Sequence, residues 1–295
     1  MRKYAILTAL LALITALSGC VQIAMGRVEI DKLFIVRMFS FDEAEEGKVR
    51  ITVTTKNLST GEGGGEAVQK GESVVSKGET VFDAARNLSA YADRKFNAGH
   101  TEFILFGESL ARKGILPYLD FISRHPEFRY NAKLYIVKGG TANSLVEKGN
   151  TSKYFVGDRL ARIEEHTGRT STVGAITLNE ALLIFDERYL DTLIPYIEPV
   201  PTRASGEKPG TCDMILSGYA ILREDKLLYF ASREESRGIN WILNRIGSGI
   251  IVVNDQTGQE ISMVIIHGIS KLKPRIESGK LYCSVEISFV TNIGE

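Results

Sequence analysis

The chain has 295 residues, of which 44% are hydrophobic and 24% are charged, a balance typical of globular proteins. Its 36 Lys and Arg residues equal its 36 Asp and Glu residues, so the formal net charge is zero. Nucleic-acid-binding domains carry a basic surplus, and the balanced charge therefore argues against a nucleic-acid partner. The length is sufficient for two domains of ordinary size.

The first twenty residues read MRKYAILTALLALITALSGC and predict an export signal. Arg2 and Lys3 give a basic start, and the apolar run from Ala5 to Leu17 is too short to cross a bilayer but has the length of a secretory signal core. A buried core helix is disfavoured because the run has no polar face.

The signal ends in LSGC, which resembles the lipobox of bacterial lipoproteins. In that class of signals the cysteine thiol is alkylated by diacylglycerol and the chain is cut before it. We therefore expect residues 1–19 to be a lipoprotein signal peptide and Cys20 to be a lipidation site that binds the protein to membrane lipid. Two or three acyl chains hold a protein stably at a bilayer. The alternative is an ordinary cleaved signal with an incidental cysteine.

Two further cysteines, Cys212 and Cys283, lie in the C-terminal third of the chain. In an exported protein they can pair, but their spacing does not decide it. The interpretation we favour is that both are small buried hydrophobic residues.

The first part of the mature chain predicts a mixed sheet with helices packed on it. Strands are expected over 28–41 and 48–58, and the Gly-, Ser- and Glu-rich stretch 59–79 is interpreted as an exposed loop. Its segment GESVVSKG lacks the second Gly and the final Ser or Thr of a phosphate-binding loop. The remaining expected elements are helices at 80–96, 108–124 (broken near 114–117), 142–147, 156–166 and 178–185, and strands at 101–106 and 131–138.

Composition changes at residues 199–210, PVPTRASGEKPG, which we interpret as a domain boundary. Beyond it we expect strands at 214–224 and 226–232, a helix at 235–246 and strands at 249–253, 261–267 and 280–290. The predicted fold is therefore α+β with two domains. An N-terminal mixed sheet with packed helices spans 20–200, and a smaller β-rich domain with one main helix spans 211–295.

No constellation of residues in the sequence calls for catalysis, a cofactor or a metal ion. The four histidines lack a second ligand at metal-binding spacing, and no G-x-S-x-G motif is present. His267 lies in the apolar stretch MVIIHG and is interpreted as a core or strand-end histidine. Trp241, the single tryptophan, is expected to pack between helix and sheet, with a role at an interface as the alternative.

Two segments, 99–139 and 217–243, resemble the C-subunit family of spore germinant receptors, the Ger(x)C lipoproteins. The first carries a His before a strand, a Gly-Glu helix start and two spaced Arg. The second carries a strand, an Asp-Lys-Leu turn and a Glu-Glu-x-x-Gly helix start. The matching residues are His100, Gly107, Glu108, Ala111, Arg112, Gly114, Arg124 and Arg129, then Gly218, Ala220, Leu222, Asp225, Lys226, Leu227, Glu234, Glu235 and Gly238.

The resemblance implies a lipid-anchored subunit without known enzymatic activity, on the extracytoplasmic face of the spore inner membrane. It would work there with two integral membrane receptor subunits that sense nutrients and trigger germination. The chain departs from the family at Val21, where a Trp is usual, and at Glu295, where a third domain usually begins. We therefore expect either a shortened member or a truncated product that ends at the start of that third domain.

Two other functions are open from the residues. A solute-binding lipoprotein would hold a small nutrient in a cleft between two lobes hinged at 199–210. An envelope hydrolase is disfavoured, because no nucleophile and base occur at a suitable spacing.

Overall fold

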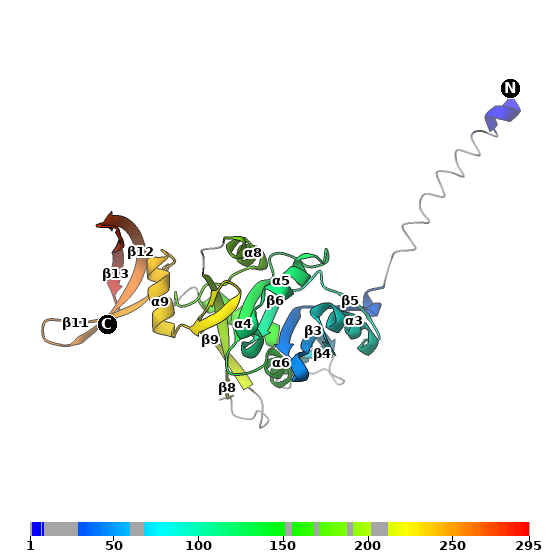
Figure 1. Ribbon diagram of the computed structural model, residues 1–295, viewed down its shortest axis with the longest axis horizontal. Helices are drawn as coiled ribbons and strands as arrows, with labels where there is room; N and C mark the ends of the chain where they lie inside the picture. The colour runs from blue at the N-terminus through cyan, green and yellow to red at the C-terminus, as the bar shows by residue number, and fades with distance from the viewer. Residues whose placement is uncertain are drawn as a thin grey trace.

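The structure, a computed structural model of the chain, describes residues 2–6, 8, 29–59, 68–150, 155–167, 171–187, 191–201 and 212–294. Cys20 and most of the expected signal peptide lie outside the described residues. The described chain forms a large mixed sheet covered by helices, followed by a small antiparallel sheet with one helix (Figure 1). The predicted α+β architecture is therefore confirmed.

The large sheet has eight strands in the order β10-β9-β8-β7-β6-β2-β3-β4. Its centre is parallel, because β6 pairs with both β2 and β7, and β7 pairs with β8; the outer strands are antiparallel. The strands are β2 (Met38–Glu43), β3 (Val49–Ser59), β4 (Val68–Gly78), β6 (Phe103–Gly107), β7 (Lys133–Val137), β8 (Thr192–Pro201), β9 (Cys212–Arg223) and β10 (Lys226–Phe230). A separate parallel pair joins β1 (Leu33–Ile35) to β5 (Lys95–Asn97).

Helices cover both faces of the large sheet, because the side chains on both faces of its central strands are buried. On β6, Ile104 and Phe106 point into one core cluster and Phe103 and Leu105 into the other. The first cluster is closed by α3 (Val81–Tyr91), α4 (Glu108–Lys113), α5 (Leu116–Ser123) and α8 (Leu178–Asp186). The second is closed by α6 (Ala142–Asn150) and α7 (Val156–Thr167). The predicted break between residues 114 and 117 is confirmed, since α4 ends at Lys113 and α5 begins at Leu116.

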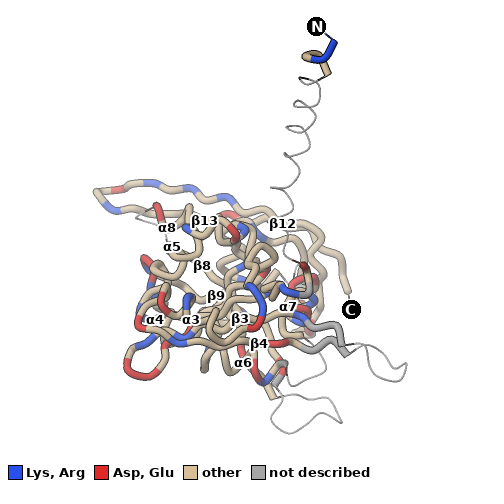
Figure 2. The backbone as a smooth tube through the Cα atoms, turned by 90° about the vertical axis from the view of Figure 1, so that its right-hand side faces the viewer, with Lys and Arg blue, Asp and Glu red and all other residues tan. Residues whose placement is uncertain are grey.

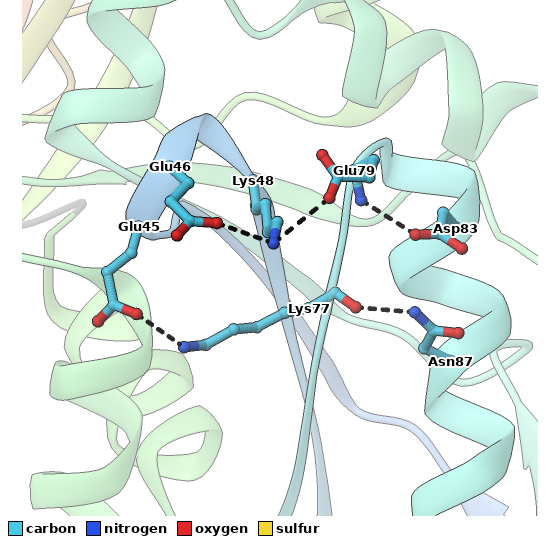
Figure 3. Close-up of polar contacts among 7 residues, drawn as sticks. All are labelled: Glu45, Glu46, Lys48, Lys77, Glu79, Asp83 and Asn87. Atoms are coloured by element: carbon cyan, nitrogen blue, oxygen red, sulfur yellow. Dashed lines mark hydrogen bonds and ion pairs between the residues drawn. The ribbon is translucent and has the colours of Figure 1, made fainter.

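The stretch predicted as a loop at 59–79 contains a strand, and that expectation was wrong for residues 68–78. β4 pairs with β3 along its whole length, and polar contacts tie its end to its neighbours (Figure 3). Lys77 lies 3.4 Å from Glu45 in the single-turn 3-10 helix Glu45–Gly47, and its carbonyl accepts a hydrogen bond from Asn87 of α3. The Gly and Ser content concealed a strand that its cross-strand partners stabilise.

β8 was not predicted, because Pro195, Pro199 and Pro201 lie within it. The amide of Lys138 donates to the carbonyl of Ile197, so the backbone N–H and C=O groups of Ile197 point toward β7. The backbone N–H and C=O groups of successive residues point alternately to the two sides of a strand. The backbone groups of the three prolines therefore also point toward β7 rather than β9. β7 pairs with β8 only at Tyr196 and Ile197, so the missing N–H groups cost no ladder bonds.

The segment between β8 and β9, residues 202–210, lies outside the described residues. The two strands that flank it pair with one another over ten positions, so β9 and β10 extend the large sheet beyond the expected boundary at 199–210. The division into 20–200 and 211–295 remains a prediction.

The C-terminal sheet has the order β11-β12-β13 and packs against α9 (Arg233–Ile242). Its strands are β11 (Gly249–Asn254), β12 (Glu260–Glu277) and β13 (Lys280–Ile293). Trp241 of α9 packs edge-on against Phe289, with ring centroids 5.6 Å apart. A Cβ on Gly268 would lie 3.0 Å from the same indole. Helix-to-sheet packing is therefore confirmed as a role of Trp241.

The β12–β13 hairpin is amphipathic and extends past α9 (Figure 1). Cross-strand partners share a face, so Leu272 with Val285 lies on one face and Lys271 with Glu286 on the other. Figure 2 shows blue Lys and Arg segments along this hairpin. Two predictions for this region were wrong. His267, expected in a core or at a strand end, is exposed and lies within β12, and Cys283, expected to be buried, is exposed with a free thiol. Both faces of the hairpin beyond α9 are exposed, so the alternation of apolar and polar residues there does not imply that the apolar face is buried.

Among the described residues, no helix is long and apolar enough to cross a membrane.

Candidate functional site: a joint between two segments and a cavity

The two segments that carry the predicted resemblance meet at the junction of α4 and α5. The backbone amide of Ile115 donates to the carbonyl of Asp225 at 3.0 Å, and that of Leu116 to the Asp225 carboxylate at 3.2 Å. Asp225 lies in the β9–β10 turn, where Glu224 adopts a φ of 55°. Gly114 and Asp225, 111 positions apart in the sequence, therefore form one structural joint.

Glu108, at the start of α4, links this joint to the end of β7. Its carboxylate accepts hydrogen bonds from the Gly139 amide at 2.8 Å and from Arg112 at 2.6 and 3.0 Å. Burial alone would raise the pKa of Glu108, but these donors outweigh it and hold the pKa below its ordinary value. The Arg112 guanidinium lies 5.8 Å from the ring centroid of Phe230 on β10.

Gly107 is required by the close approach of Asp42. A Cβ at Gly107 would lie 2.1 Å from a carboxylate oxygen of Asp42. Asp42 is buried and accepts hydrogen bonds from the Ala142 and Asn143 amides at 2.7 and 2.8 Å, which caps α6. Burial raises the pKa of Asp42 despite these donors. Gly107 thus leaves room for the Asp42 side chain that caps α6, and Glu108 joins the start of α4 to the end of β7.

The start of α9 is fixed on β9 by Gly218 and a buried network. A Cβ at Gly218 would lie 2.3 Å from the Ala231 carbonyl, so only glycine permits this approach. Ser232 and Glu235 form a capping box, and Glu235 also accepts the Tyr229 hydroxyl at 2.9 Å.

Behind this cap, the Tyr219 hydroxyl donates to Asn240 at 3.0 Å and accepts from the Gly174 amide at 2.6 Å. The Asn240 amide in turn donates to the Ser171 carbonyl at 2.9 Å. All three side chains, Tyr219, Asn240 and Ser171, are buried. The network therefore joins β9, α9 and the 171–174 segment.

His100 and Arg129, from separate parts of the first segment, line one cavity of about 280 Å³. Lys133 forms an ion pair with Glu164 in its wall, and the Tyr135 hydroxyl also donates to Glu164. Burial raises the pKa of Glu164, although Lys133 opposes the effect. The described residues include no group of three or more His, Cys, Asp or Glu arranged to hold a metal ion.

The other residues of the two segments have simple positions. Ala111, Ala220, Leu222 and Leu227 are buried in the first core cluster. Arg124 is an exposed residue paired with Asp120, and a Cβ at Gly238 would meet nothing within 4 Å. Lys226 and Glu234 are exposed, near the starts of β10 and α9. Cys20, the expected lipidation site, lies outside the described residues.

A larger cavity of about 740 Å³ lies along β8 and β9. This volume is within the range of small-molecule and peptide sites. Its walls come from α7, β8, β9, β10 and the start of α9, together with Lys138 after β7 and Thr172 before α8. The lining residues are Lys138, Arg159, Ile163, His166, Thr172, Tyr196, Glu198, Met214, Ile215, Leu216, Ser217, Phe230, Ser232 and Arg233.

Cations border an aromatic and aliphatic floor in this cavity. The Lys138 ammonium lies 5.1 Å from the Tyr196 ring centroid, 5.6 Å from that of Phe230 and 3.9 Å from the Glu198 carboxylate. Burial raises the pKa of Tyr196. Arg159 forms a two-bond ion pair with Asp213 at 3.0 and 2.9 Å.

This cavity could not be predicted from the sequence, because its lining residues come from separate parts of the chain and none forms a motif.

Two family models match the chain. The model described as "Spore germination protein N-terminal domain" matches residues 26–199, and the one described as "Spore germination B3/ GerAC like, C-terminal" matches residues 217–295.

Among curated proteins of Bacillus subtilis (strain 168), spore germination protein B3 is 24% identical over 273 residues, covering 91% of this chain and 68% of that protein. Spore germination protein KC is 23% identical over 303 residues, covering 97% of this chain and 74% of that protein. The crystal structure of the GerBC protein matches with a TM-score of 0.47 and 21% identity, covering 87% of this chain and 72% of that one. Because the two family models together match most of its length, the chain belongs to the GerAC-like family of spore germination proteins.

Proposed function

We propose that the protein is a non-catalytic, lipid-anchored subunit of a nutrient germinant receptor in the spore inner membrane and is needed for spore germination. The observation that supports this most strongly is the match of two family models to residues 26–199 and 217–295. The first twenty residues, which end in LSGC, support the lipid anchor. The shared segments also serve as joints between elements rather than as a set of reactive groups. In this role the protein contributes contacts and position, and not chemistry.

The anchor in this proposal is Cys20 with its acyl chains. Tethering the folded domains to the bilayer raises their effective concentration near membrane partners without new contacts. Cys20→Ala is expected to abolish palmitate labelling and to release the protein from membranes. Cys283→Ala is the matched control, because Cys283 is a free and exposed thiol elsewhere in the chain, and it should leave labelling intact. Labelled Cys20→Ala protein would refute the anchor.

The partners in this proposal are two integral membrane receptor subunits. An affinity-tagged protein extracted from spore membranes in mild detergent should co-purify with two multi-span proteins. Cys20→Ala should weaken that recovery even though the folded domains are unchanged. Recovery of the tagged protein alone, under conditions that preserve other membrane complexes, would argue against a receptor subunit.

A second candidate function is solute binding, favoured by the 740 Å³ cavity with its aromatic floor and cationic border. The expected hinge at 199–210 does not support it, since the strands on both sides of this segment pair within one sheet. Calorimetry of the isolated protein with amino acids and sugars tests this function. A micromolar dissociation constant for one of them would favour it over the receptor-subunit role.

A further inference from the structure

The outer edge of β9 is open along the cavity. β10 pairs with β9 only from Ala220 to Arg223, while β8 pairs with its other edge from Cys212 onward. On the β10 side, residues 212–218 have no strand partner among the described residues. An unpaired edge offers N–H and C=O groups to another extended chain.

The direction of these backbone groups follows from the alternation along β8. The backbone groups of Ile197 point toward β7, so those of Glu198 point toward β9. Those of its partner Ile215 point back toward β8. Met214 and Leu216 therefore face outward. The Met214 amide is bonded to the Asp213 carboxylate at 2.8 Å, whereas the backbone of Leu216 makes no hydrogen bond with described residues on the open side.

The side chains around this edge suit an extended, acidic segment. Ile215 is 46% exposed beside Leu216 and Phe230, which gives apolar contact for alternate residues of an added strand. Lys138, Arg159 and Arg233 border the cavity, against the carboxylates of Glu198 and Asp213. With Glu198 in the lining and Asp213 paired to Arg159, these cations exceed the carboxylates by three to two. Arg233 forms no ion pair with the described residues.

We propose that the outer edge of β9 at Asp213–Leu216 is a docking site for a short, extended, acidic segment of a protein partner, which adds as a strand. Backbone bonds to Leu216 give affinity, and carboxylates of the segment pair with Arg233 and Lys138. The register shift in the β8–β9 pairing at Ser217 bends the edge and limits the segment to a few residues. This binding function goes beyond the receptor-subunit proposal and does not depend on lipid anchoring.

The test uses the full chain in detergent and a fluorescent, capped peptide of alternating glutamate and valine, followed by anisotropy. Saturable binding that weakens with added salt is expected. A peptide with lysine in place of glutamate, and one N-methylated on alternate amides, should each bind about tenfold more weakly or not at all. Free glutamate at high concentration should not compete.

Two variants locate the site. Arg233→Glu should weaken binding about tenfold and keep the melting temperature, because an acidic residue is favourable at the first position of α9. Leu216→Pro removes the outward N–H without removing a bond to β8 and should abolish binding. Equal binding of the N-methylated peptide, unchanged binding by Arg233→Glu, or competition by free glutamate would each overturn the proposal, the last in favour of a small-molecule site.

Discussion

Gly114 lies directly against the carboxylate of Asp225, so closely that a Cβ on Gly114 would be 2.4 Å from an Asp225 oxygen. The φ of Gly114 is 132°, which side chains with a Cβ rarely adopt. This contact brings the α4–α5 junction against the β9–β10 turn. It is therefore one of the contacts between the regions matched by the two family models, together with the β8–β9 pairing and the Tyr219 network.

Gly114→Ala is expected to destabilise the protein by about 2 to 4 kcal/mol, because backbone strain and the collision with Asp225 add. The free energy of unfolding from urea titration, followed by circular dichroism, measures the effect. Gly238→Ala is the matched control, since Gly238 lies inside α9 with nothing within 4 Å of its missing Cβ. That variant should gain up to about 1 kcal/mol. Equal effects of the two substitutions would contradict the proposed joint.

The low pKa of Glu108 predicts a pH dependence of stability. A carboxyl group with a lowered pKa in the folded state favours the folded state above its ordinary pKa of 4.5, and this contribution is lost as pH falls through the folded pKa. Glu108→Gln keeps the shape but not the charge. Its unfolding free energy should be lower than that of the wild type at pH 7, and the two should converge on acidification. A difference that stays constant down to pH 2 would exclude this role for the carboxylate.

Tyr219→Phe tests the buried network beneath α9. The change leaves the Gly174 amide and the Asn240 side-chain oxygen without their partner, and a loss of about 1 to 3 kcal/mol in unfolding free energy is expected. Tyr130→Phe provides the comparison. The hydroxyl of Tyr130 also donates to a carbonyl, but its side chain is 48% exposed and water can replace the bond. Similar losses in both variants would indicate that burial of the network is unimportant.

The apolar face of the β12–β13 hairpin should bind an environment-sensitive hydrophobic dye. Leu272 and Val285, 48% and 42% exposed, are cross-strand partners on that face. Replacing both by Thr, which suits strands, should lower the dye fluorescence of the folded protein. The double change of Lys271 and Glu286 to Thr, on the opposite face, should leave it unchanged. A reversed order of these two effects would contradict the assignment of the faces.

The sequence predicted those elements whose signal is local. The helix at Thr80 begins as expected, with the Thr80 hydroxyl accepting from the Asp83 amide at 3.1 Å, and the break after Lys113 follows the Gly and Pro that cause it. β4 and β8 were missed because their signals are not local. Gly and Ser in β4, and Pro in β8, oppose a strand until the partners across the ladder are known.

The candidate site divides in the same way. The segments around Gly107 and Asp225 were recognisable, but their function as a steric and hydrogen-bonded joint appears only when β9 and β10 join the large sheet. The open edge at Leu216 could not be predicted, because it depends on how far β10 extends along β9. The exposure of Cys283 was also missed, because alternation shows which residues share a face but not whether that face is covered.

The central claim is that this protein is a receptor subunit needed for nutrient-triggered germination. The most direct test uses spores of the native organism in which this chain is the single remaining member of its family. Loss of refractility after nutrient addition is then compared with and without the gene. Deletion is expected to abolish the nutrient response, the wild-type gene to restore it, and Cys20→Ala to restore it poorly. A normal nutrient response in spores without the gene would show that the protein is not a receptor subunit needed for germination.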